Sequence, residues 1–224
     1  MKTEIIKYYD NLADKYDADR FSNSYGKYIH IQELNVLKKY VSKNNIDKNL
    51  DLACGTGRFL DFAKYGTDLS SEMIKVSKLK FPNKRITKGD AEELPFEDCY
   101  FENIFSFHLL MHLDLETLKK VQKEASRVCK PNGYFIFDIP SEKRRRLFGF
   151  KKSSWHGGYQ ISYNELKNVV NNNWEIHNFH GVAFFPIHRI PKILRKFFIP
   201  LDTFLCNSIL KEYSSHLIFI LKKK

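Results

Sequence analysis

The 224-residue sequence predicts an α/β fold built on an open, doubly wound sheet. A short apolar run at 50–52 is followed by a turn of small residues at 53–57 and by the start of a helix at Arg58. Further along, apolar strand-like runs alternate with amphipathic helical stretches, as at 101–107 and 115–129. A strand carrying an acidic residue, then a glycine turn and a helix, is typical of sheets that bind a nucleotide cofactor.

Length and composition indicate a single soluble domain with a substantial core, since 43% of the residues are hydrophobic and 28% are charged. The chain begins without the apolar segment of a secretory signal, and no run approaches the ~18 apolar residues of a membrane span. Cys54, Cys99, Cys129 and Cys206 are scattered without a CxxC pair, so we expect reduced thiols, no zinc site and a cytoplasmic protein.

Positive charge is concentrated in the last third of the chain. Residues 139–224 contain 15 Lys/Arg and 5 Asp/Glu, whereas residues 1–138 contain 22 and 21. This imbalance indicates an acidic substrate, an anionic membrane surface or a nucleic acid as partner. A solvated, lysine-rich surface without a partner is the open alternative.

Two helices are expected before the first strand. Residues 3–17 and about 27–42 carry apolar side chains at helical spacing, and the second helix is expected to bury Ile31, Leu34 and Leu37. The glycine turn then follows the strand at 50–52. Gly55 and Gly57 allow close backbone approach to a ligand or a positive φ, and the helix after them would aim its free N–H groups at an anionic group.

The segment Asp51-Leu52-Ala53-Cys54-Gly55-Thr56-Gly57 resembles the first motif of class I S-adenosylmethionine-dependent methyltransferases, of the small-molecule, type 11-like group. Leu60 stands where a dinucleotide fingerprint has its third glycine, which disfavours a nicotinamide cofactor. The resemblance implies a Rossmann-like, doubly wound seven-stranded sheet whose last strand is antiparallel. One domain would comprise an N-terminal helical cap (1–45), a cofactor-binding core (46–140) and a substrate-side lid with the last two strands (141–224).

Two later acidic residues match further motifs of that family. Asp68 matches the acid that ends the second strand and binds both ribose hydroxyls, and a carboxylate accepts two such hydrogen bonds. It follows Gly57 by only 11 residues, so the helix from Arg58 to Lys64 and the second strand must be short. Asp90 and Ala91 match the residues that bind adenine. The resemblance implies these cofactor contacts: Asp51, Ala53, Cys54, Gly55, Gly57, Asp68, Leu69, Met73, Asp90, Ala91, Glu92 and Phe107.

The remaining elements follow from turn and capping signals. Lys130-Pro131-Asn132-Gly133 resembles the family's turn before the fifth strand, expected at 134–139. Ser162-Tyr163-Asn164-Glu165 is a capping box that opens a helix to about Val170. A strand is expected at 174–180 and another at 215–221. Between them, residues 186–211 show helical spacing, with Pro191 and Pro200 starting or breaking the helices.

The implied reaction is in-line transfer of a methyl group from S-adenosylmethionine to an O, N or C nucleophile, which leaves S-adenosylhomocysteine and needs no metal. Positioning supplies much of the acceleration, and a general base is needed only for an acceptor that arrives protonated. His108 and His156 are the candidate bases, with His112, Asp138 and Tyr159 behind them. Tyr8, Tyr9 and Tyr16 are candidates to line the cap. A structural role remains the alternative for each histidine and tyrosine.

The acceptor class stays open at this stage. A small molecule or a lipid- or glycan-linked molecule is expected, acidic molecules included. The position after the fourth strand reads Ser106-Phe107-His108-Leu109 and lacks the N-P-P-Y-like motif of nucleic-acid amino-methyltransferases, so a nucleic acid is disfavoured. The basic amphipathic stretch 186–211 fits either a lid over the substrate or a peripheral membrane contact, and the lid is the preferred interpretation. A non-catalytic cofactor-binding protein is the remaining alternative.

Overall fold

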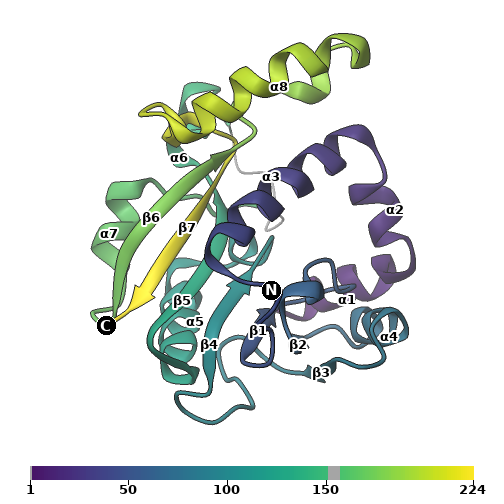
Figure 1. Ribbon diagram of the computed structural model, residues 1–224, viewed down its shortest axis with the longest axis vertical. Helices are drawn as coiled ribbons and strands as arrows, with labels where there is room; N and C mark the ends of the chain where they lie inside the picture. Colours follow the sequence, from purple (N-terminus) through teal and green to yellow (C-terminus); the bar gives the residue numbers. More distant parts are fainter. Residues whose placement is uncertain (1, 151–156) are drawn as a thin grey trace.

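The computed structural model describes residues 2–150 and 157–224 and contains a seven-stranded sheet (Figure 1). Its order is β3-β2-β1-β4-β5-β7-β6, in which β1 to β5 are parallel and β7 runs antiparallel to both β5 and β6. The strands are β1 (Asn49–Leu52), β2 (Tyr65–Asp68), β3 (Arg85–Lys88), β4 (Phe101–Ser106), β5 (Cys129–Pro140), β6 (Trp174–Val182) and β7 (His216–Lys223). The predicted doubly wound sheet with an antiparallel last strand is confirmed.

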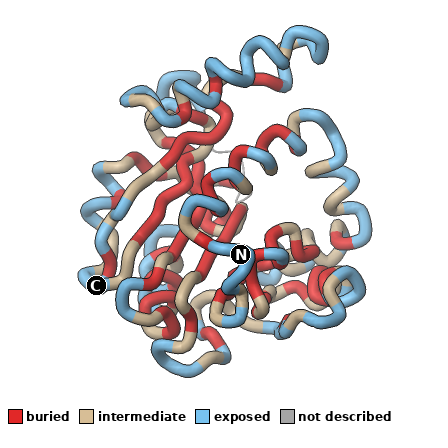
Figure 2. The backbone as a smooth tube through the Cα atoms, in the orientation of Figure 1, coloured by how far each residue is buried: buried red, intermediate tan, exposed pale blue. Residues whose placement is uncertain are grey.

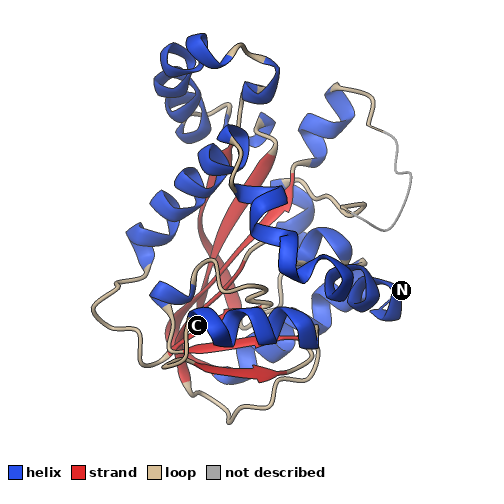
Figure 3. Ribbon diagram, turned by 90° about the vertical axis from the view of Figure 1, so that its right-hand side faces the viewer, coloured by secondary structure: helices blue, strands red, loops and turns tan. Residues whose placement is uncertain are grey.

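Helices cover both faces of this sheet (Figure 3). They are α1 (Lys2–Leu12), α2 (Tyr16–Phe21), α3 (Ser24–Tyr40), α4 (Ser71–Lys80), α5 (Leu115–Val128), α6 (Glu142–Leu147), α7 (Tyr163–Val169) and α8 (Lys192–Asn207). Short 3-10 turns occur at Ala13–Lys15, Leu60–Phe62, Leu110–His112, Ile187–Arg189 and Lys211–Tyr213. The predicted helices before the first strand are therefore present, and the helical chain continues to Phe21.

The core follows from the alternation of side chains along the central strands. On β5, Phe135 and Phe137 face the cluster formed with α5 and α7, whereas Ile136 faces the cluster formed with α3. The strand beside it alternates in the same way, with Phe219 on the first side and Ile220 on the second. Strands buried on both faces are expected in the middle of such a sheet, and these two hold the molecule together.

Side-chain caps explain where several helices begin. The Asn23 side chain accepts hydrogen bonds from two backbone N–H groups of α3, so this helix starts three residues earlier than its apolar pattern indicates. Ser162 and Glu165 form the predicted capping box at α7, which is confirmed. In α3 the prediction that Ile31 is buried is wrong. The buried face instead includes Gln32 and Glu33, whose side chains have polar partners inside the protein.

Two other expectations about helices are corrected. No α-helix follows the glycine turn, because only the 3-10 turn Leu60–Phe62 separates it from β2. Helix α8 also continues through Pro200 without a break, and Pro191 is its N-terminal cap residue. Much of α8 lies on the surface, where a missing backbone hydrogen bond is replaced by water, so one internal proline is tolerated.

Candidate active site

The first cavity lies at the carboxyl ends of β1, β2 and β4, under α1. Sheets of this type bind ligands where neighbouring strand connections diverge, and here they diverge between β1 and β4. Nine of the predicted cofactor residues line this cavity: Ala53, Gly55, Asp68, Leu69, Met73, Asp90, Ala91, Glu92 and Phe107. Asp51 and Cys54 instead line a smaller side cavity next to it, and Gly57 lines neither.

The glycine turn is built by backbone conformations that favour glycine. Ala53, Gly55 and Gly57 have φ angles of 57°, 52° and 90°. A Cβ on Gly55 would meet no atom within 4 Å, whereas a Cβ on Gly57 would lie 2.7 Å from the ring of Phe81. Gly55 therefore opens space at the cavity, and Gly57 serves the packing of the turn. Because no α-helix begins here, the expected helix dipole aimed at the ligand is absent from this turn.

Asp68 ends β2 with its carboxylate held by the neighbouring backbone. The N–H groups of Gly55 and Ser70 each donate a hydrogen bond of 2.8 Å to it. Burial raises the pKa of Asp68, and the backbone donors oppose that rise. The short β2 thus still delivers this residue to the first cavity, because β2 pairs in register with both β1 and β3.

Asp90 and Glu92 are bound by the first residues of the chain. The Nζ of Lys2 lies 2.6 Å from a carboxylate oxygen of each. Burial favours the protonated form of Asp90, but the hydrogen bond and charge of Lys2 lower its pKa overall. Lys120 adds a contact of 3.1 Å to Glu92. Helix α1 is therefore tied to the segment predicted to bind adenine.

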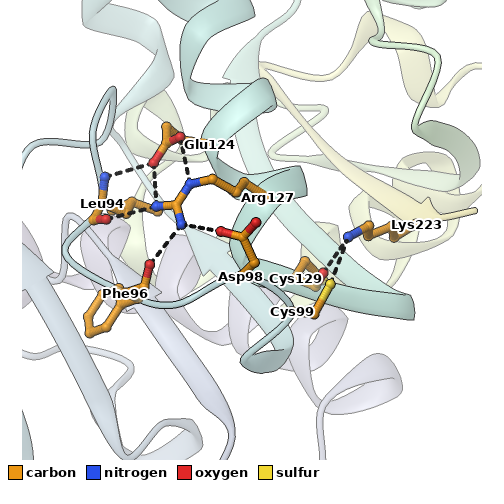
Figure 4. Close-up of polar contacts among 8 residues, drawn as sticks. All are labelled: Leu94, Phe96, Asp98, Cys99, Glu124, Arg127, Cys129 and Lys223. Carbon is orange, nitrogen blue, oxygen red and sulfur yellow. Dashed lines mark hydrogen bonds and ion pairs between the residues drawn. The ribbon is translucent and has the colours of Figure 1, made fainter.

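Arg127 on α5 supports the loop that follows Asp90 (Figure 4). Its guanidinium donates to the backbone oxygens of Leu94 and Phe96 at 2.9 and 2.8 Å. It also makes a two-point contact with Glu124 and a contact of 2.7 Å with Asp98. Five donors in a rigid plane allow one arginine to hold a whole loop.

Asp51 is a buried acid whose charge is only partly balanced. Its Oδ2 finds no hydrogen-bond partner among the described residues. Burial raises the pKa of Asp51 well above its usual value, although Arg58 opposes the rise. An acceptor atom of this kind, beside the glycine turn, is suited to a cationic group of a ligand.

Next to the first cavity lies a chain of buried and half-buried charges centred on His108. The imidazole Nε2 lies 2.9 Å from Glu33, its Nδ1 lies 3.4 Å from Asp138, and the backbone N–H of His108 donates to Asp138 at 2.5 Å. Arg58 continues the chain with a contact of 2.8 Å to Glu33, and its guanidinium lies over the ring of Phe21. His108 has a φ of 63°, a left-handed conformation that its bond to Asp138 helps to hold.

The charges in this chain alternate in sign. Burial disfavours the charged imidazole, but Asp138 and Glu33 outweigh burial and raise the pKa of His108. Burial likewise opposes ionisation of Glu33, and Arg58 together with His108 lowers its pKa to about 2. Ligand atoms of Glu33, His108 and Asp138 lie within 4.8 Å of one another. The two carboxylates already have Arg58 and the imidazolium as cationic partners, which is the arrangement of an ion-pair network.

The second cavity adjoins the first and shares Tyr9, Tyr16, His108 and His112 with it. The Oη of Tyr9 lies 2.8 Å from Nε2 of His112, whose Nδ1 accepts a hydrogen bond from the N–H of Gly157. A neutral His112 that accepts at Nδ1 carries its proton on Nε2 and donates it to Tyr9. Other parts of the second cavity come from α2 and α3: Asp19, Arg20, Phe21, Asn23, Tyr25, Gly26 and Ile29.

Sequence reasoning placed some of these residues and missed others. His108 lies at the boundary of the two cavities, whereas His156 lies outside the described residues. Tyr159 lines neither cavity and is tied through its N–H to the carbonyl of Met111. Glu33 and Lys2 were not anticipated. The signal for Glu33 is an acidic residue on the buried face of an amphipathic helix, and Lys2 carries no comparable signal.

Comparison with known proteins agrees with this geometry. A family model described as a methyltransferase domain matches residues 50–137. An uncharacterised protein of Methanocaldococcus jannaschii is 30% identical over 245 residues, which cover 99% of this chain and 92% of that protein. Demethylmenaquinone methyltransferase of Chlorobaculum parvum is 32% identical over 169 residues, which cover 67% of this chain and 68% of that enzyme.

Solved structures share the fold over its whole length. A SAM-dependent methyltransferase of Thermotoga maritima, described as a possible histamine N-methyltransferase, has a TM-score of 0.72 at 18% identity, with 98% of this chain and 99% of that one covered. Magnesium protoporphyrin IX methyltransferase of Synechocystis, with bound S-adenosylhomocysteine, has a TM-score of 0.69 at 13% identity and full coverage of both chains. With its sequence relatives, motifs and sheet order, this chain belongs to the class I S-adenosylmethionine-dependent methyltransferases.

Proposed function

We propose that this methyltransferase acts on a small or lipid-linked acceptor held in the second cavity, with the methyl donor in the first. The observation that carries the proposal is the shared wall of Tyr9, Tyr16, His108 and His112 between the two cavities. A donor in one and an acceptor in the other would meet at this wall. Holding two reactants in line accounts for much of the acceleration of such a transfer.

The residues of the first cavity fit S-adenosylmethionine. Asp68 offers a fixed carboxylate for the ribose hydroxyls, and Asp51, in the adjoining side cavity, offers a buried oxygen without a hydrogen-bond partner among the described residues for the amino group. Gly55 leaves open space where a side chain would intrude. Asp90 and Ala91 stand at the adenine end, where Lys2 would have to share Asp90 with the ligand. When bound, S-adenosylmethionine supplies a methyl group on a positively charged sulfur.

The geometry of the histidines supports an acceptor that needs no strong base. Both ring nitrogens of His108 face carboxylates and its pKa is raised, so in this arrangement it does not accept a proton from an acceptor. His112 donates to Tyr9, whose hydroxyl then orients the acceptor. A carboxylate or an acidic enol reaches the site with a usable lone pair at neutral pH, whereas an aliphatic amine arrives protonated. His156 remains a candidate base from the sequence.

The position of Arg20 favours an acceptor that carries an acidic group. Its side chain lines the second cavity, and its Nη2 donates a hydrogen bond of 2.7 Å to the hydroxyl of Tyr8. An arginine at the edge of a cavity pairs well with a carboxylate or phosphate. We therefore place the anionic end of the acceptor near Arg20 and its nucleophile near Tyr9.

Calorimetric titration with S-adenosylhomocysteine tests the donor site. Asp68→Asn keeps the size of the side chain but removes its charge, so we expect the affinity to fall roughly ten- to a hundredfold. Asp61→Asn is the matched control, because Asp61 is an exposed residue outside both cavities whose carboxylate pairs with Lys43 at 3.3 Å. Equal affinity in wild type and Asp68→Asn, or no binding by wild type, would overturn the assignment.

A radiolabel experiment tests the acceptor site. Wild-type protein is incubated with methyl-labelled S-adenosylmethionine and either amines, carboxylates and phenols or a lipid extract. We expect label in an acidic product, and Arg20→Gln to raise KM about tenfold or more through loss of a charge-assisted contact, with little change in kcat. Label found only in added RNA or DNA would refute the small-molecule proposal.

A further inference from the structure

Exposed apolar side chains gather at one end of the molecule. Of the sixteen large apolar residues exposed in the described part of the chain, thirteen lie in two segments, 147–150 and 193–213. They are Leu147, Phe148, Phe150, Ile193, Leu194, Phe197, Phe198, Ile199, Leu201, Phe204, Ile209, Leu210 and Tyr213. Figure 2 shows α8, which carries most of them, as a largely pale blue helix at the end of the molecule far from β3. We call residues 142–150 and 189–213 the α6–α8 surface.

Helix α8 is attached by a narrow polar face and presents its apolar face outward. Asp202 is buried and accepts hydrogen bonds from the Tyr28 hydroxyl and from Gln32 at 3.0 Å, both on α3. Ile193, Phe197, Leu201 and Phe204 lie on the opposite side at helical spacing, and Ile193, Phe197 and Phe204 are 75%, 67% and 68% exposed. An amphipathic helix normally buries its apolar face, but this face is not covered by any of the residues 2–150 and 157–224.

The exposed charged side chains around this apolar face are all basic. The α6–α8 surface contains nine Lys/Arg and three Asp/Glu. Asp202 is buried, Glu212 is paired with Lys143 at 2.5 Å, and Glu142 lies 3.7 Å from Arg146. Lys192 and Lys196 are exposed on α8 itself, beside Ile193 and Phe197. The surface therefore combines a central apolar strip with basic residues and no exposed acid of its own.

We propose that the α6–α8 surface binds an anionic membrane surface, with α8 lying in the plane of the lipid headgroups. Its phenylalanine, isoleucine and leucine side chains would enter the boundary of the acyl chains, and its lysines would meet the anionic headgroups. No helix among residues 2–150 and 157–224 is both long and apolar enough to cross a bilayer. Contact is then with one face of the membrane. A lid over the substrate, the interpretation preferred from the sequence, is the alternative to this proposal, and no α8 residue lines either cavity.

Charge disfavours the other occupants of this surface. A symmetric dimer through α8 would set the basic residues of one copy against those of the other, which costs binding energy. A nucleic acid would meet the lysines through its phosphates but would leave Ile193 and Leu201 without a matching surface. An anionic bilayer offers both the negative charge and the apolar layer behind it.

The surface also reaches the acceptor cavity. Tyr25, which lines the second cavity, packs its ring 5.0 Å from that of His188, just ahead of α8. The guanidinium of Arg195 on α8 donates a hydrogen bond to the hydroxyl of Ser24, at the start of α3. Tyr25 of the cavity lining thus contacts the residue just before the α6–α8 surface, and Arg195 of that surface contacts Ser24, which stands between Asn23 and Tyr25 of the lining. A lipid-soluble acceptor would have a short path into the protein, and membrane binding itself does not depend on what the acceptor is.

Vesicle flotation tests the proposal with the full-length protein. Vesicles of phosphatidylcholine alone are compared with vesicles containing about 30% phosphatidylglycerol, at low salt and at about 0.5 M NaCl. We expect wild type to bind the anionic vesicles at least about tenfold better than the neutral ones, with weaker binding at high salt. No binding to anionic vesicles at low salt would overturn the proposal.

Paired variants separate α8 from general surface effects. Phe197→Ser/Phe204→Ser and Lys192→Glu/Lys196→Glu should each weaken vesicle binding at least about tenfold. The controls Ile31→Ser/Leu79→Ser and Lys38→Glu/Lys39→Glu change exposed residues elsewhere and should bind as wild type does. Retained binding by the α8 variants would refute the proposal. So would a wild-type dimer that Phe197→Ser/Phe204→Ser converts to a monomer, or RNA binding that displaces the vesicles.

S-adenosylhomocysteine titration of the same variants keeps this test apart from the proposed function. The α8 residues lie outside the first cavity, so all of these variants should bind the ligand as wild type does. Lost vesicle binding with intact ligand binding supports the membrane proposal alone. Loss of both in the α8 variants would show a folding defect and count against a surface role.

Discussion

At the scale of single residues, the most consequential group is the chain of buried and half-buried charges formed by Arg58, Glu33, His108 and Asp138. Each of these side chains needs its neighbour, since an isolated charge inside a protein is costly and a paired one is tolerated. The chain joins α3 to the ends of β4 and β5 at the boundary of the two cavities. We infer that His108 positions this boundary as a cation.

Removing the Glu33 charge should destabilise the protein at neutral pH. It should also make the free energy of unfolding less dependent on pH in the acid range. Glu33→Gln leaves Arg58 and His108 without their shared anion, which costs about 3–5 kcal/mol. The lowered pKa of Glu33 means that its contribution is present above about 4.5 and is lost as the pH falls toward about 2. Urea unfolding of both proteins at several pH values measures this. The same acid dependence in wild type and variant would contradict it.

His108 should have the opposite pH dependence. Its raised pKa means that its contribution is complete below its usual value of 6.5 and is lost as the pH rises through the raised value. Wild type should therefore lose more unfolding free energy than His108→Gln as the pH rises above neutrality. NMR titration of the His108 ring measures its pKa directly. His188 is the internal comparison, because partial burial of this otherwise exposed ring and the nearby arginines lower the pKa of His188. A His108 that titrates below His188 would disprove the ion-pair interpretation.

At the scale of elements, the turn after β1 owes its open space at the first cavity to its backbone conformation. It is made without a following α-helix, so close approach to a ligand depends on positive φ angles and on missing side chains. The shortened β2 and the supported loop after Asp90 then place the two acids at the edge of the same cavity. Each of these elements can be tested by a substitution with a matched partner elsewhere.

Gly55→Ala and Gly149→Ala form one such pair. Both glycines have a positive φ, of 52° and 63°, and at both a Cβ would meet no atom within 4 Å. Each change should cost about 1 kcal/mol in unfolding free energy because alanine is strained there. Only Gly55 lines the first cavity, so only Gly55→Ala should weaken S-adenosylhomocysteine binding by calorimetry. Equal affinities in the two variants would show that the turn does not contact the ligand.

Arg127→Met and Lys119→Met form another pair on α5. Loss of Arg127 leaves the carbonyls of Leu94 and Phe96 without their donor, and we expect a cost of about 2–4 kcal/mol and a mobile loop. Lys119 makes an exposed contact of 2.9 Å with Glu116, which is worth about 0.5 kcal/mol or less. Chemical denaturation measures both. Equal costs would show that the loop is held by something other than Arg127.

At the scale of the whole molecule, the N-terminal helices close the first cavity from above. The contacts that tie them to the core include the ion pairs of Lys2 with Asp90 and Glu92, and the hydrogen bonds of Asp10 with the Ser70 hydroxyl and of Asp17 with Thr56. The contact of Lys2 with Asp90 is exposed and those of Asp10 and Asp17 are half-buried. Because partly exposed ion pairs are weak, we expect the cap to open at modest cost. Entry of the donor would require this opening, and the second cavity would be assembled with it, since α2 contributes to its lining.

Hydrogen exchange should report this coupling. S-adenosylhomocysteine should slow amide exchange in α1 and α2 by roughly tenfold or more, because the bound ligand adds contacts that hold the cap closed. Exchange in α8 should stay unchanged, since none of its residues lines the first cavity. Mass spectrometry of peptides from both regions measures the effect. Slowing in α8 but not in α1 would contradict a closing role for the N-terminal helices.

From the sequence alone, the fold class, the antiparallel last strand, the capping box at Ser162 and the family could be predicted, because these depend on local periodicity and on short motifs around Asp51, Asp68 and Asp90. Nine of the predicted cofactor residues meet in one cavity for the same reason. Only the tertiary structure decided how His108 is used and which face of α8 is exposed. The charge state of His108 depends on Glu33 and Asp138, far away in the chain, and amphipathic spacing does not say which side of a helix the rest of the protein covers.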